Sequence, residues 1–374
     1  MFFGFFGLFL YVFFTVTPVF AADCGFPVPA EVKIGRHGHE VWHDNTLWTQ
    51  PRLKGDTRPI QVPTGWVALG ADHIQGGCAY FPEEQGVLFI NPEHYSRTIL
   101  SVDGAGFDYV VWAPKATPND TLEGILQWFV RLTTKALPLF PQGVGQSRQM
   151  DVLVTSGMIE GDEDIPENMV FPLPGPHLIV ISRPLDGERA HQLLAHTIVH
   201  IFNRYHMPPV FTSFMQDELL SHIFYQEMVA AWFEFVTALT RAERTALFNK
   251  LWQNYQAAMD GDPATKPTAR TLAVMEDFPE NPKVTDIHSA QPIKIFYEYY
   301  VMPLAALALD TRLRQQNADK GIADMFTDIH NGTYPSFTPA LKAYLGDEGM
   351  HLMQSWLAAE PIPYSDLKEA MERF

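Results

Sequence analysis

The chain has 374 residues, of which 47% are hydrophobic and 18% are charged. This composition provides for a substantial core in one large or two modest domains and excludes a largely disordered chain. The net charge of −17 argues against nucleic acid or an anionic membrane surface as the partner.

The first 22 residues form an uncharged, mostly apolar segment that ends in two alanines. Val19-Phe20-Ala21 fits the small-x-small rule of signal-peptide cleavage, so we expect a signal peptide over residues 1–22. This predicts an exported protein, periplasmic or secreted, that contacts no membrane beyond this segment. Because no Lys or Arg stands near the start, an uncleaved membrane anchor is the alternative.

Cys24 and Cys78 are the only cysteines in the chain. In an exported protein, two cysteines most simply form one disulfide, which here would close a long loop behind the new N-terminus. Two unrelated thiols are the alternative.

The predicted elements change in kind along the chain. Short apolar runs interrupted by Gly and Pro predict a β-rich N-terminal part over residues 23–115. A helix is expected over 117–141, with Pro138 as its stop, and strands are expected over 150–158 and 177–182. Helical patterns then cover residues 187–206, 217–240, 241–258, 293–316, 321–330 and 338–347.

These patterns predict an α+β protein with a mostly helical C-terminal half. After the signal segment (1–22) and the β-rich domain (23–115), we expect a mixed α/β region over 116–240 and a helical domain over 241–374.

His196 and His200 lie four residues apart in "LLAHTIVHIFN". On a helix this spacing puts both imidazoles on one face, as in the zinc motif His-Glu-x-x-His. The pair alone is weak support for a metal site in a chain with 14 histidines. Two histidines that pack in a helix without metal are therefore the alternative.

The segment "YQEMVAAWFEFV" (225–236) resembles the helix that carries the glutamate ligand in gluzincin aminopeptidases. "HIFN" after the histidine pair resembles the His-x-Trp-Asn of the glycyl aminopeptidase family within the gluzincins. The resemblance implies a thermolysin-like catalytic domain in which Glu227 joins His196 and His200 as a zinc ligand. That family usually carries a PDZ domain, which we do not expect here.

Further weak matches follow in the family's order, so that the resemblance covers roughly residues 120–374. The stretch 297–329 is similar to the family's Tyr-x-Lys-Gly helix, which implies Tyr299 as the catalytic tyrosine, with Tyr297 and Tyr300 as rivals. "IPENMVF" (165–171) resembles the segment that binds the substrate's amino group. It implies Glu167 and Asn168 as substrate-binding residues, although Glu167 also fits a charge in an acidic loop.

Thr197 departs from the family pattern, because the residue after the first histidine is the general-base glutamate there. A threonine hydroxyl is no base near neutral pH, and general acid–base help is typically worth about 100- to 10,000-fold. The sequence therefore predicts a zinc-peptidase-like protein with weak or no activity. A pseudopeptidase that binds a peptide or protein N-terminus through the inherited cleft is the alternative, followed by a metal-free structural domain. The sequence leaves the oligomeric state open.

Overall fold

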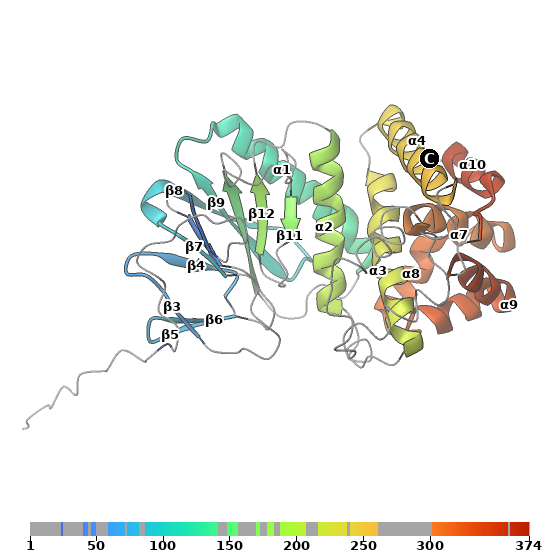
Figure 1. The fold of residues 1–374 in the computed structure, drawn as a ribbon, viewed down its shortest axis with the longest axis horizontal. Helices are drawn as coiled ribbons and strands as arrows, with labels where there is room; N and C mark the ends of the chain where they lie inside the picture. The colour runs from blue at the N-terminus through green and yellow to red at the C-terminus, as the bar shows by residue number, and fades with distance from the viewer. Residues whose placement is uncertain are drawn as a thin grey trace, which may run out of the picture.

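A computed structural model provides the coordinates of the chain (Figure 1). It describes residues 24, 40–43, 46–49, 59–71, 73–81, 87–140, 148–155, 170–172, 178–182, 188–206, 216–237, 240–260, 301–357 and 360–373. Within these ranges, no helix combines the length and the apolar character that crossing a membrane requires.

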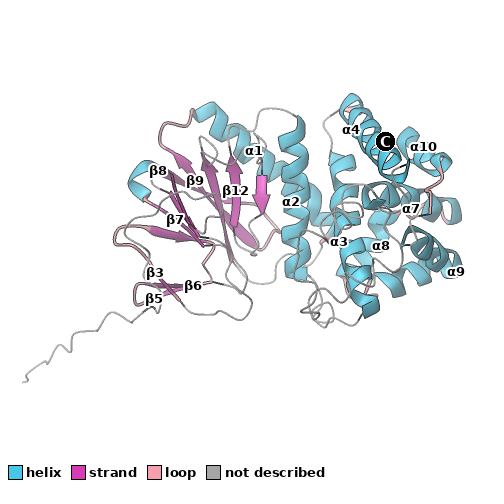
Figure 2. Cartoon of the chain, viewed as in Figure 1, coloured by secondary structure: helices cyan, strands magenta, loops and turns pink. Residues whose placement is uncertain are grey.

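The strands gather in the N-terminal half and the helices in the C-terminal half, as the sequence predicted (Figure 2). Two short 3-10 helices, η1 (Pro92–His94) and η2 (Leu137–Leu139), stand among them. The strands are β1 (Glu40–His43), β2 (Thr46–Thr49), β3 (Ile60–Gln61), β4 (Val67–Leu69), β5 (His73–Gln75), β6 (Cys78–Tyr80), β7 (Val87–Ile90), β8 (Tyr95–Ser101), β9 (Phe107–Pro114), β10 (Arg148–Thr155), β11 (Val170–Pro172) and β12 (Leu178–Ser182).

A five-stranded mixed sheet occupies the centre of the N-terminal half. Its order is β11-β12-β10-β9-β8, with β10 parallel to both β9 and β12, and with the edge strands β8 and β11 antiparallel to their neighbours. Helix α1 (Asn119–Ala136) forms the crossover from β9 to β10, because parallel neighbours require a long connection. The sheet thus takes strands from both sides of residue 115, where the sequence pattern had predicted a domain boundary.

Alternation along β9 explains why its sequence, "FDYVVWAP", is apolar almost throughout. Phe107, Tyr109 and Val111 pack into the large core that the sheet shares with the helices. Val110 and Trp112 point to the opposite face and pack with residues of the N-terminal strands β4 and β7. Successive side chains of a strand face opposite sides, so a sheet covered on both faces needs apolar residues at nearly every position.

The N-terminal strands form two small antiparallel sheets, of order β1-β2-β7-β4 and β3-β6-β5. Cys24 is joined to Cys78 on β6 by a disulfide, with 5.5 Å between the two Cα atoms. This confirms the predicted pairing. The bond ties residue 24 to the smaller of these two sheets.

The helices follow the sequence prediction closely, with differences at their ends. The helix expected over 117–141 ends at Ala136 and is followed by the 3-10 helix η2, which contains Pro138. The helix expected to end at residue 347 continues to Leu357, because the chain turns at Gly346 (φ +61°) and then resumes a helical path. The helices are α1 (Asn119–Ala136), α2 (Glu188–His206), α3 (Gln216–Thr237), α4 (Arg241–Asp260), α7 (Met302–Gln316), α8 (Ile322–His330), α9 (Phe337–Leu357) and α10 (Tyr364–Arg373).

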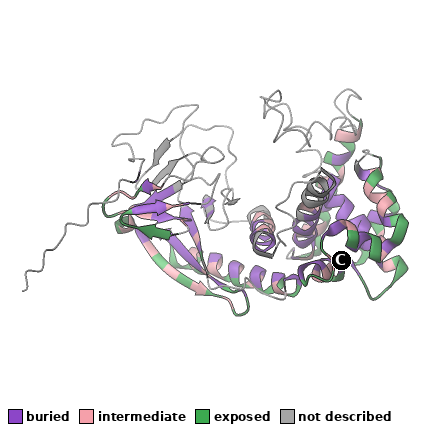
Figure 3. Cartoon of the chain, turned by 90° about the horizontal axis from the view of Figure 1, so that it is seen from below, coloured by how far each residue is buried: buried purple, intermediate pink, exposed green. Residues whose placement is uncertain are grey.

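Helix α3 lies in the middle of the helical half and packs against α2, α7 and α9. Its segment from Met228 to Phe233 is buried on all sides. Figure 3 shows buried stretches in purple in both the strands and the helices of the chain. A helix without a polar face has to be covered all round. The two charged side chains in its second half, Glu227 and Glu234, therefore need partners inside the protein.

Candidate metal centre

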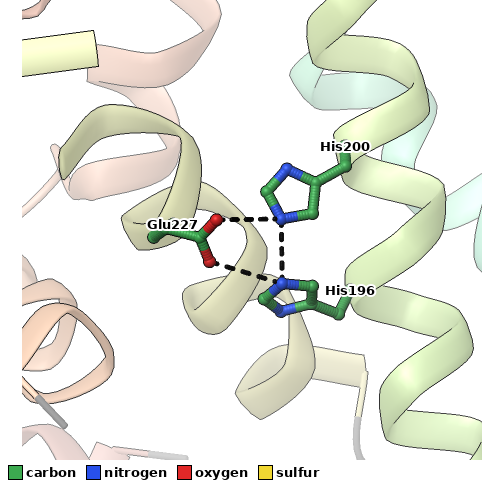
Figure 4. A group of neighbouring side chains, drawn as sticks. All are labelled: His196, His200 and Glu227. Atoms are coloured by element: carbon green, nitrogen blue, oxygen red, sulfur yellow. Dashed lines mark hydrogen bonds and ion pairs between the residues drawn. The ribbon is translucent and has the colours of Figure 1, made fainter. Parts of the chain in front are cut away.

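Helices α2 and α3 lie side by side and bring three side chains to one point (Figure 4). His196 and His200 project from one face of α2, and Glu227 projects toward them from α3. Each of the three offers a ligand atom that lies within 4.8 Å of the others. Their side chains are 22%, 16% and 15% exposed, respectively, so the group is sheltered but open to a small ion.

The distances suit a tetrahedral ion. Nε2 of His196 and Nε2 of His200 lie 3.4 Å and 3.3 Å from the two Glu227 oxygens. A zinc ion with bonds of about 2.0–2.2 Å holds its ligand atoms roughly 3.3–3.6 Å apart. The two imidazole nitrogens are 2.8 Å apart and need to separate by about 0.5 Å to reach that value. Two histidines and one glutamate form the ligand set of a catalytic zinc site, which leaves a fourth position open.

Glu234 supports this arrangement from behind, and the sequence prediction did not include it. Its carboxylate accepts a hydrogen bond of 2.5 Å from Nδ1 of His196. This fixes the tautomer of His196 and leaves Nε2 to face Glu227. Metal-binding histidines almost always donate their second ring nitrogen to such a partner. The sequence did indicate this role, because Glu234 stands seven positions after Glu227 and therefore lies on the same face of the helix.

The electrostatics of the metal-free group are dominated by these two carboxylates. Burial by itself lowers the pKa of His196, but the hydrogen bonds and charges of Glu227 and Glu234 outweigh it and raise that pKa well above its usual value. Burial raises the pKa of Glu227, but the charge of His200 and the contacts with His196 bring it well below its usual range. A metal that bound there would therefore replace a proton.

Thr197, at the position of the missing base, is only 2% exposed. Its α2 neighbours Ile198 and Val199 are fully buried in the large core. A threonine suits such a place, because a charged carboxylate without a partner would be costly there. The described part of the site thus brings together His196, His200 and Glu227, and it buries Thr197 beside them.

Three predicted site residues cannot be placed. Glu167 and Asn168, predicted to bind substrate, and Tyr299, predicted to be catalytic, lie outside the described residues. The strand that follows residue 168, β11, is an edge strand that packs against α2. Residue 168 therefore precedes the sheet edge nearest to the histidine helix.

A buried polar network holds the far end of α2. Asn203, from the "HIFN" motif, lies 3.2 Å from Nε2 of His330 at the end of α8, and Tyr225 of α3 bonds to the same nitrogen. The other ring nitrogen of His330 lies 2.5 Å from the carbonyl oxygen of Leu139. His330 therefore joins α8 to α2 through Asn203 and to α3 through Tyr225.

Comparison with solved structures shows a fold similar to that of an aminopeptidase N family protein. An aminopeptidase N family protein from Idiomarina loihiensis matches with a TM-score of 0.52 at 16% identity, over 87% of this chain and 58% of that chain. The M1 zinc metallopeptidase from Deinococcus radiodurans gives 0.45 at 12% identity, over 87% and 72% of the two chains. Native yeast LTA4 hydrolase gives 0.49 at 12% identity, over 85% and 51%.

No protein-family model matches the sequence, and no curated protein matches it either. At these identities the structural likeness speaks for the fold alone, and the chain spans 58% of the length of the Idiomarina protein. The chain has an aminopeptidase N-like fold, with a sheet-rich N-terminal part and a mostly helical C-terminal half, as its sequence predicted.

Proposed function

We propose that the chain is an exported, zinc-binding member of the gluzincin aminopeptidase-like proteins that hydrolyses peptides weakly or not at all. The observation that carries the proposal is the convergence of His196, His200 and Glu227, with Glu234 behind His196 and Thr197 buried beside it. Zinc at this site would polarise a carbonyl group and acidify a bound water.

The residues of the site would have separate roles in metal binding and in proton transfer. His196, His200 and Glu227 would hold the ion, and Glu234 would keep His196 in the orientation that presents Nε2. No carboxylate follows the first histidine to accept the proton of a water molecule, since Thr197 stands there. We therefore expect binding to be retained and turnover to be lost, because the two depend on different residues.

A pseudopeptidase is the second form of the same proposal, and the burial of Thr197 favours it. Its partner would be a peptide or the N-terminus of a protein, lying beside β11, which is an edge strand of the sheet formed by the described residues and could pair with an extended chain. Glu167 and Asn168 precede that strand in the sequence by two or three residues and remain the proposed groups for a free amino terminus.

Export is the third part of the proposal. It is supported by the uncharged 22-residue start of the sequence and by the Cys24–Cys78 disulfide, since structural disulfides persist in oxidising compartments. A mature chain that begins near Ala22 or Asp23 in mass spectrometry is the expected result. An intact Met1 would contradict it.

Metal analysis of the purified protein tests the central claim. We expect about one zinc per chain, lost in His200→Ala and retained in the control Glu243→Gln, which changes a carboxylate outside the site.

Binding of a peptide with a free N-terminus is then measured with the zinc-loaded protein, and product formation is followed in the same sample. Zinc binding with slow or absent cleavage supports the proposal. If the protein contains no zinc after incubation with the metal, the chain is a metal-free structural domain and the proposal is wrong. If the wild type cleaves peptides rapidly and His196→Ala does not, another residue supplies the base.

A further inference from the structure

A second group of polar side chains lies away from the candidate metal centre, between α1, α2 and the start of α4. Arg131 and Lys135 stand one turn apart on α1, and Arg244 lies in the first turns of α4. The ring of His191 on α2 lies 5.4 Å from that of Trp128, which lies one turn before Arg131. His191 and His196 are five residues apart and thus lie on different sides of α2.

These side chains are close enough to influence one another. Burial first, and then the positive charges of Arg131 and Arg244, lower the pKa of Lys135. Burial first, and then the charge of Arg131, likewise lower the pKa of His191, with Lys135 adding to the effect and Glu243 opposing it. Three cations therefore share one small region of a chain whose net charge is −17.

The group has polar atoms without partners. Nε2 of His191 and Nε of Arg244 are buried and make no hydrogen bond to any described residue. No ion pair joins Arg131, Lys135 or Arg244 to a carboxylate within the described ranges. The carboxylate of Glu243, whose charge acts on His191, caps α4, where it accepts a hydrogen bond of 2.7 Å from the Thr240 amide.

A group of neighbouring cations with unpartnered buried nitrogens is energetically unfavourable when nothing is bound to it. Buried polar atoms normally have partners, and an unsatisfied one points to a water or an ion that is held there. Like charges in proximity also repel, and water screens this repulsion only in part at Arg131 and Arg244, whose side chains are half-buried. One bound anion would relieve both costs, since it would pair with the cations and accept from the Arg244 and His191 nitrogens.

We propose that Arg131, Lys135, Arg244 and His191 form a binding site for a tetrahedral oxyanion, a phosphate or sulfate group. Guanidinium groups bind such anions through paired N–H donors, and a neutral imidazole adds one donor. The site is independent of the metal centre, because it uses the opposite side of α2. Its ligand is either a free ion or the same group carried on a larger molecule.

The test uses the full chain at constant ionic strength, with chloride exchanged for inorganic phosphate or sulfate. We expect a saturable rise in the melting temperature and a 1:1 stoichiometry in calorimetry. Arg131→Gln should weaken phosphate binding about tenfold or more, as expected for a lost charge-assisted contact. Arg97→Gln, the same change on the edge strand β8, should leave it unchanged. A phosphate monoester that binds as well as phosphate would identify a group carried on a larger molecule, and one that fails to bind would identify the free ion.

Two further measurements distinguish this site from general salt effects and from an anion at the metal centre. In chloride alone, Arg131→Gln should melt at the same temperature as the wild type or higher, because it removes a repulsive charge. The phosphate response should persist in His200→Ala, which excludes an anion held by a metal at the other site. A phosphate or sulfate response no larger than that to chloride, an equal loss in Arg131→Gln and Arg97→Gln, or a response abolished by His200→Ala would overturn the proposal.

Discussion

Glu234 and His196 are joined by a 2.5 Å hydrogen bond between Oε1 and Nδ1, across the interface of α3 and α2. The bond orients His196, which contacts both His200 and Glu227. The candidate metal centre is thus built from two helix faces that hold each other in register, and not from a pair of histidines alone.

Removal of this bond should weaken metal binding without unfolding the protein. In Glu234→Gln the side chain keeps its size but loses its charge, so His196 becomes a less basic and less well oriented ligand. We expect zinc affinity to fall about 10- to 100-fold, the usual effect of losing such a support. Competition with a chelator measures the affinity. Glu243→Gln is the matched control, and equal affinities in the two variants would count against a positioning role for Glu234.

Restoring the carboxylate at residue 197 should restore hydrolysis. In Thr197→Glu, a general base would stand beside the first histidine, and a gain on the order of 100-fold or more in peptide hydrolysis is expected. The assay uses a peptide with a free N-terminus and zinc-loaded protein. Thr197→Gln has a similar size without a base and should gain nothing.

The same substitution carries a risk for stability, because Thr197 is 2% exposed. A buried carboxylate that finds no partner destabilises a protein. The melting temperature of Thr197→Glu therefore has to be measured beside the activity. A folded, zinc-loaded variant without activity would show that the catalytic deficit extends beyond residue 197.

The disulfide should contribute strongly to the stability of the N-terminal sheets. The bond spans a sequence separation of 54 residues, and a closed loop of that size corresponds to about 4 kcal/mol in the chain-entropy treatment. The double variant Cys24→Ser/Cys78→Ser should unfold at lower denaturant concentration than the wild type. Its zinc content should be unchanged, because the bond lies outside α2 and α3. An identical unfolding midpoint would contradict the prediction.

Stability should depend on pH through His191. Burial, followed by the nearby charges of Arg131 and Lys135, lowers the pKa of His191 to about 4, although Glu243 acts in the opposite direction. Its usual value is about 6.5, so between these values the unfolded chain binds more protons than the folded one. The contribution of His191 to the free energy of unfolding is thus fully present above about pH 6.5 and is lost as the pH falls toward 4.

His191→Gln removes this dependence, because glutamine does not titrate. Denaturant unfolding of both proteins at several pH values, in chloride, gives the difference in the free energy of unfolding. We expect the wild type to lose stability relative to the variant as the pH falls from about 6.5 to about 4. A constant difference across that range would show that His191 is not held in its neutral form.

The sequence alone determined the features that depend on local periodicity. Strand alternation and helical spacing located most of the elements, and the four-residue spacing of His196 and His200 was enough to put both on one helix face. The order of the motifs predicted the gluzincin-like fold, and the presence of two cysteines predicted a disulfide between them. The inference about the fold rested on a resemblance to a known family, and the others needed only neighbours along the chain or a count of residue types.

The tertiary structure decided what depends on contacts between distant segments. Only the packing of α2 against α3 brings Glu234 to Nδ1 of His196, and only the sheet order joins β8 and β9 to β10 across residue 115. The cation group around His191 also joins three helices whose sequences carry no shared motif. The physical reason is common to all three cases, because side-chain periodicity fixes which face a residue occupies, whereas the partner of that face is chosen when the whole core packs.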